Sequence, residues 1–139
     1  MSTGKITQIS GPVIDCMFAP GELPKIKEAL TVNVRGKQRV MEVAQHTGKD
    51  RVRCILLGAS ENLARGMEVT STGKAISVPV GDRTLGRMFN VLGNPIDEID
   101  PPAGVEYWPI HRPAPAFEEQ ATSQEMLETG IKVVDLLCP

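Results

Sequence analysis

Glycine-lysine pairs are the first residues in this chain that could do chemistry, because a phosphate-binding loop contains such a pair. The pattern G-x-x-x-x-G-K-[ST] arranges backbone amides around a phosphate, while the lysine and the next hydroxyl reach the outer phosphate and its Mg²⁺. Gly-Lys occurs at positions 4–5, 36–37, 48–49 and 73–74. The following residues are Ile6, Gln38, Asp50 and Ala75, so none completes the pattern. We expect these pairs to be turn residues.

The two histidines do not form a recognisable metal site. His46 and His111 lie far apart, and neither belongs to a His/Cys cluster with zinc-like spacing. The run Asp97-Glu98-Ile99-Asp100 suggests a cation site, but it lacks the glycine and the distal glutamate of an EF-hand loop. We expect structural histidines, either exposed or hydrogen bonded, and solvated acidic loops at 97–100 and at Glu118-Glu119.

Two arginines are candidates for contact with phosphate. Arg87 and Arg112 lie in a stretch rich in proline and glycine. A single arginine in such a segment more often pairs with a carboxylate across an interface, and we expect that role for both. The sequence thus predicts no catalytic, cofactor-binding or metal-binding residue.

Composition limits the possible partners. The chain has 139 residues, a formal net charge of −2 and 4% aromatic residues, and it contains no basic block. Nucleic acid and anionic membranes therefore have little electrostatic attraction for it. No stretch approaches the roughly 20 apolar residues of a membrane span. We expect neither a nucleic-acid partner nor direct membrane insertion.

The three cysteines indicate a reducing compartment. Cys16, Cys54 and Cys138 are odd in number and widely spaced, which favours free thiols over a disulfide framework. The amino terminus enters strand-like residues with neither an apolar signal core nor an Arg-rich presequence. We therefore expect the chain to be exposed to the cytosol.

Short strands dominate residues 1–78. Apolar and polar residues alternate with a period of two, and glycine-bearing turns at 35–37 and 48–50 separate strands as hairpins. Six or seven strands follow, and we expect them to close into a small barrel, with an open sandwich as the alternative. The segments are Lys5–Ile9, Val13–Phe18, Leu30–Val34, Val40–Val43, Arg51–Leu57, Met67–Thr70 and Ile76–Val80.

Residues 79–139 differ from residues 1–78 in their composition. Seven of the 11 prolines lie between positions 79 and 121, which leaves little room for regular helix or central strand. Gly93-Asn94-Pro95 is a turn by its chemistry, and Trp108–Pro115 reads as an extended arm. A helix is expected between Thr129, its N-cap, and Pro139, which stops it. Its apolar residues surround the axis, which is typical of a helix covered by protein.

Several segments of the chain resemble the β subunits of F-type ATP synthases in the order in which that family has them. The matching segments are 4–13, 79–97, 108–115, 123–125 and 129–139. The last segment is similar to the catalytic β form, whereas the non-catalytic α form departs after Thr129-Gly130-Ile131-Lys132.

The resemblance implies a mainly β fold: an amino-terminal barrel over 1–78, then a connecting arm and an incomplete start of an α/β P-loop nucleotide-binding domain over 79–139. In the family, the P-loop, the metal-holding carboxylate and the other nucleotide-binding residues lie beyond the position matched by Pro139. The chain is thus expected to be an amino-terminal fragment, inactive alone. The parent would use MgATP and MgADP in proton-driven ATP synthesis.

The implied partners are the α subunits of the hexamer, with the central-stalk subunits reached through the parent. The expected location is the cytoplasmic face of the bacterial inner membrane, within the peripheral F1 sector. A free-standing oligonucleotide-binding barrel is the alternative function. That alternative requires basic grooves and exposed aromatic residues, and the barrel region offers only Phe18.

Overall fold

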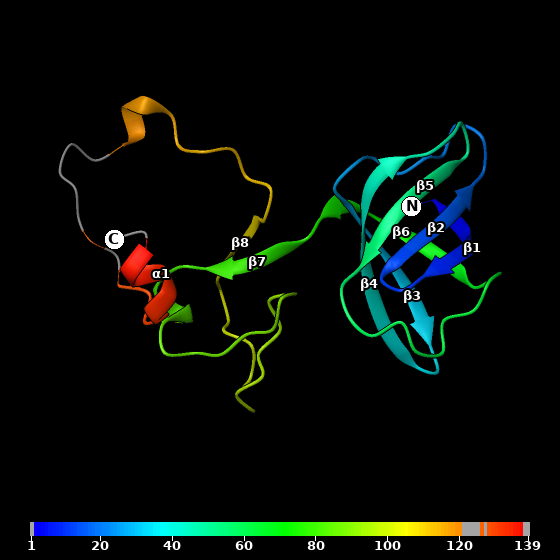
Figure 1. The fold of residues 1–139 in the computed structure, drawn as a ribbon. Helices are drawn as coiled ribbons and strands as arrows, with labels where there is room; N and C mark the ends of the chain where they lie inside the picture. The colour runs from blue at the N-terminus through cyan, green and yellow to red at the C-terminus, as the bar shows by residue number, and fades with distance from the viewer. Residues whose placement is uncertain (1, 121–125, 127, 138–139) are drawn as a thin grey trace.

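The protein is described by a computed structural model that covers residues 2–120, 126 and 128–137. Six antiparallel strands close into a barrel in the spatial order β1-β2-β5-β4-β3-β6, and β6 returns to pair with β1 (Figure 1). The expected closed barrel is confirmed, and the open sandwich is wrong. The strands are β1 (Thr3–Ser10), β2 (Val13–Phe18), β3 (Glu28–Val34), β4 (Lys37–His46), β5 (Arg51–Leu56) and β6 (Glu68–Ala75).

The barrel core follows from the period-two pattern, because alternate side chains of each strand point inward. In β5, for example, Val52, Cys54 and Leu56 are buried while Arg51 and Arg53 face outward. Aliphatic side chains fill the interior, and Phe18 is its one aromatic residue. The core residues are Ile6, Ile14, Cys16, Phe18, Leu30, Val32, Val34, Met41, Val43, Val52, Cys54, Leu56 and Val69.

Only two of the four Gly-Lys pairs lie in turns. The turn between β3 and β4 places Arg35 and Gly36 at φ of 52° and 81°, as a tight hairpin requires, and Gly48 lies in the connection from β4 to β5. The prediction was wrong for the other two pairs. Gly4 lies in β1, where a Cβ atom would come within 2.6 Å of the Met17 carbonyl oxygen. Gly73 lies in β6 at φ of 70°.

The seventh expected strand does not join the barrel. Residues Ser77–Val80 form β7, which pairs with β8 (Glu106–Pro109) in a separate two-stranded antiparallel sheet. The physical reason is that pairing of β1 with β6 already closes the barrel, so no strand edge remains for β7. The barrel therefore has six strands, and the first residues of the expected arm, Trp108 and Pro109, belong to a strand.

The remaining elements are short. They are η1 (Asp82–Thr84), η2 (Phe117–Glu119) and α1 (Lys132–Leu137). The expected helix is present over 132–137, but it begins three residues after Thr129, which is therefore not its N-cap. The Asp135 carboxylate instead accepts hydrogen bonds from the amides of Thr129 and Gly130, both at 3.0 Å. Val133 and Leu136 are 66% and 79% exposed, so the cover that their apolar character predicts does not come from the described residues.

Candidate functional site

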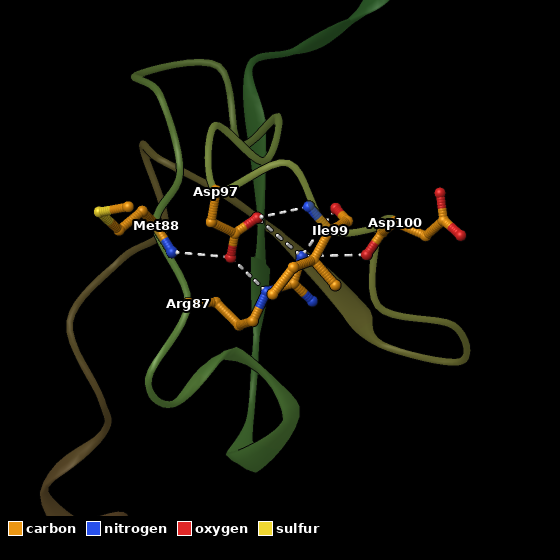
Figure 2. Close-up of polar contacts among 5 residues, drawn as sticks. All are labelled: Arg87, Met88, Asp97, Ile99 and Asp100. Carbon is orange, nitrogen blue, oxygen red and sulfur yellow. Dashed lines mark hydrogen bonds and ion pairs between the residues drawn. The ribbon is translucent and has the colours of Figure 1, made fainter.

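Arg87 is the centre of a polar cluster outside the barrel. Its Nε donates to Asp97 Oδ2 at 2.5 Å and its Nη2 donates to Asp97 Oδ1 at 3.1 Å, so the contact is bidentate (Figure 2). Nη2 also donates to the carbonyl oxygens of Ile99 and Asp100, each at 3.0 Å. One guanidinium thus holds three successive parts of the loop that follows β7.

Turns within the loop place Asp97 next to Arg87. Phe89 and Pro95 form an isolated antiparallel bridge, and the Asn90 side chain accepts hydrogen bonds from the amides of Leu92 and Asn94. Gly93 has φ of 76°, as expected for the turn at 93–95. This hairpin-like turn of residues 89–95 therefore positions Asp97 opposite Arg87.

Electrostatics at this cluster keep both groups charged. The side chains of Arg87 and Asp97 are only 15% and 9% exposed. The hydrogen bonds from the Arg87 guanidinium hold the pKa of Asp97 well below its usual range, and the amides of Met88 and Ile99 add to that effect. The same contact raises the pKa of Arg87.

The role of the Arg87 cluster is structural. A guanidinium that already holds a carboxylate and two carbonyl groups is a poor phosphate clamp, because a phosphate would have to displace these partners. The expected carboxylate partner is present, but it comes from the same loop rather than from across an interface. The acidic run at 97–100 therefore includes a paired carboxylate at Asp97, not only solvated side chains.

Arg112 has a different contact. Its guanidinium carbon lies 3.7 Å from the centroid of the Trp108 ring, a cation-π stack. The predicted carboxylate partner is not among the ion pairs of the described residues.

Both histidines are hydrogen bonded, as expected. His46 Nε2 lies 2.8 Å from the carbonyl oxygen of Pro24, and His111 Nε2 lies 2.8 Å from Glu42 Oε2. Within the described ranges, no group of three or more His, Cys, Asp or Glu side chains could hold a metal ion.

Glu28 is a buried carboxylate that the sequence reading missed. It is 8% exposed and accepts hydrogen bonds from the Ser71 hydroxyl and from the amides of Lys25 and Gly73, the latter two at 2.9 and 3.0 Å. Burial raises the pKa of Glu28, but these donors outweigh burial and leave the pKa below its ordinary value. A glutamate at the start of an alternating strand was the feature of the sequence that could have indicated it.

Two cysteine thiols lie in the barrel core. Cys16 and Cys54 are free and completely buried. Contact with Cys16 and burial both raise the pKa of Cys54, so this thiol stays neutral and unreactive in the folded state. The third cysteine, Cys138, and its expected fast labelling lie outside the described residues.

In the described part of the chain, no helix is both long and apolar enough to cross a bilayer.

Comparison with known families gives a match that lies over the barrel. Residues 6–73 match the model described as "ATP synthase alpha/beta family, beta-barrel domain". The match begins within β1 and ends within β6, so it covers β2 to β5 completely and most of β6 and part of β1. The matched range therefore coincides with the closed barrel of this structure. The barrel of this chain is accordingly similar to the beta-barrel domain of that family.

Proposed function

We propose that this chain is the amino-terminal portion of a catalytic β subunit of an F-type ATP synthase, and that its barrel acts in assembly of the α/β hexamer. The observation that carries the proposal is the family match over residues 6–73, which coincides with a closed six-stranded barrel. The choice of β over α rests on the resemblance of residues 129–139 to the β form.

A closed barrel suits an assembly role for a physical reason. It has no unpaired strand edge, so a neighbour must meet its side chains rather than extend its sheet. Apolar side chains such as Met17 and Ile55, which are 40% and 46% exposed, lie on its outer face and are available for such contacts. The barrel would thereby set the spacing between subunits.

The parent complex would make ATP from ADP and phosphate with a proton gradient, and its MgATP and MgADP would bind to residues other than those of this chain. The α subunits would flank the barrel, and central-stalk subunits would be reached through the parent. The complex would lie at the cytoplasmic face of the bacterial inner membrane. The chain alone would neither bind nor hydrolyse ATP.

Association with an α subunit tests the assembly role. The 139-residue chain is mixed with a purified bacterial α subunit, and sedimentation velocity is expected to show a complex of the two. Calorimetric titration with MgATP should show no binding below millimolar nucleotide. Absence of the complex, or a one-to-one MgATP isotherm with micromolar affinity, would refute the proposal.

The oligonucleotide-binding alternative is tested in the same samples with a fluorescent single-stranded DNA. Base stacking requires exposed aromatic rings, and Phe18 is 4% exposed inside the barrel. We therefore expect no change in anisotropy. Micromolar binding of this DNA without association to α would favour the alternative.

A further inference from the structure

The barrel and the β7–β8 sheet are joined by the chain itself and by a side-chain contact. The first is covalent, where β6 passes through Ile76 into β7. The second is the contact of His111, just after β8, with Glu42 in the middle of β4, at 2.8 Å between Nε2 and Oε2. Between them, the Ile110 amide donates to the Ile76 carbonyl oxygen at 3.0 Å. The chain therefore leaves the barrel at residue 76 and is fastened back to it at residue 111.

We propose that the His111–Glu42 contact is a pH-dependent clasp, which holds the β7–β8 sheet to the barrel more firmly when the imidazole is protonated. A neutral imidazole can donate one hydrogen bond from Nε2 to the carboxylate, whereas a protonated imidazole makes the bond charge-assisted and shorter. Histidine is the side chain suited to change charge between about pH 5 and 8. This inference does not depend on the proposed assembly role.

Partial burial makes the clasp stronger than an ordinary surface pair. The side chains of His111 and Glu42 are 30% and 19% exposed, so solvent and salt screen their attraction less than that of a fully exposed pair. The sheet that they hold consists of only two strands, and such a sheet is marginally stable without further support. The anchor at residue 111 therefore matters for the order of β8.

The strands beside Glu42 present no competing charge directly opposite it. Its cross-strand neighbours are Ala29 in β3 and Ile55 in β5. On β5, the Arg53 guanidinium is bound to Asp15 at 2.8 and 2.9 Å. Lys27, just before β3, lies beside β4, where its amide donates to the Val43 carbonyl oxygen at 2.8 Å.

The segments that carry the two partners add three further cations. Lys37 and Arg39 precede Glu42 on β4, and Arg112 follows His111 but is stacked on the Trp108 ring. His46, at the end of β4, is bound to the Pro24 carbonyl oxygen. In the described structure, Glu42 is therefore the carboxylate that pairs with His111 when the imidazole is charged.

Amide hydrogen exchange of the 139-residue chain tests the clasp, with protection factors corrected for the intrinsic effect of pH. The Ile110 amide reports on the anchor, and the Leu57 amide, which donates to Val40 at 2.9 Å, reports on the barrel. Protection of Ile110 is expected to rise about threefold from pH 8 to pH 5.5, the effect of a modest ion pair. Protection of Leu57 should not follow that change.

Two variants remove the charge but keep the size of each partner. In His111→Gln and in Glu42→Gln, protection of Ile110 should no longer depend on pH, while Leu57 protection shows that the barrel is intact. His46→Gln is the matched control and should behave as the unchanged chain does. A pH-independent Ile110 amide in the unchanged chain, or a threefold rise that persists in Glu42→Gln, would overturn the proposal.

Discussion

The Ser71 hydroxyl of β6 donates a hydrogen bond to the Glu28 carboxylate of β3 inside the barrel wall. This contact lies beside an irregularity in the β3–β6 register, between Glu28 and Leu30, where Gly73 has a positive φ. The amide of Gly73 at this irregularity donates to the same carboxylate at 3.0 Å and to the Ser71 hydroxyl oxygen at 3.2 Å. A buried charge thus stabilises a strand junction that regular ladder bonds do not hold.

The first prediction is that Glu28→Gln lowers the free energy of unfolding by about 1–3 kcal/mol at pH 7, since it weakens hydrogen bonds to a buried charged group. The pKa of Glu28 is lowered in the folded state, so its contribution is present above the unfolded value of about 4.3 and is lost as the pH falls through the lower folded value. Urea unfolding at pH 7 and pH 3 should show the difference from the unchanged chain narrowing at pH 3.

Glu22→Gln provides the control for this experiment, because Glu22 is exposed. Its effect should stay within about 0.5 kcal/mol at both pH values. A Glu28→Gln variant as stable as the unchanged chain at pH 7 would contradict the role given to the carboxylate.

The second prediction concerns Asp97, whose pKa the Arg87 guanidinium lowers. The ion pair therefore contributes above the unfolded carboxyl pKa of about 3.9 and is lost as the pH falls toward the lower folded value. In nuclear magnetic resonance spectra, the amides of Met88 and Ile99, which both donate to Asp97 at 3.3 Å, should shift and exchange faster in this acid range.

Asp97→Asn should produce the same changes already at pH 7, while barrel amides stay protected. Arg87→Lys should do so as well, because lysine lacks the planar fork that makes the bidentate contact. Glu98→Gln, at an exposed position of the same loop, is the control and should leave these amides unchanged. Unaltered Met88 and Ile99 signals in Asp97→Asn would show that the pair does not order the loop.

The third prediction compares one substitution at two depths. Leu30 is completely buried in the barrel, and Leu30→Ala should lower the free energy of unfolding by about 2–5 kcal/mol, because it leaves a cavity. Leu136 is 79% exposed in α1, and Leu136→Ala should change stability by no more than about 0.5 kcal/mol. Urea denaturation followed by circular dichroism measures both. Similar losses for the two variants would mean that α1 is covered in solution.

The fourth prediction concerns the core thiols, studied in Cys138→Ser so that only Cys16 and Cys54 remain. Both are buried, so a thiol reagent should modify them only as fast as the barrel opens, and completely in denaturant. The pKa of Cys54 is raised in the folded state, so the barrel should lose stability as the pH rises above the unfolded thiol value of about 8.5.

Cys54→Ala should remove that loss between pH 7.5 and pH 9.5, which urea midpoints would show. Rapid modification of both cysteines under native conditions would be inconsistent with their place in a closed core.

The sequence by itself determined the local features of this protein. The alternation of apolar and polar residues specified where strands run, and glycine-bearing turns at 35–37 and 48–50 specified hairpins, because both depend on residues close together in the chain. The density of prolines after position 79 likewise predicted the scarcity of regular elements, since proline lacks an amide hydrogen.

Tertiary structure decided everything that depends on distant residues meeting. A strand-forming pattern at 76–80 did not reveal that β1 and β6 would close the barrel first and leave β7 to pair with β8. Arg87 finds its partner 10 positions away, and His111 finds Glu42 69 positions away. Such contacts depend on register and closure, which are properties of the whole barrel and its arm rather than of any short segment.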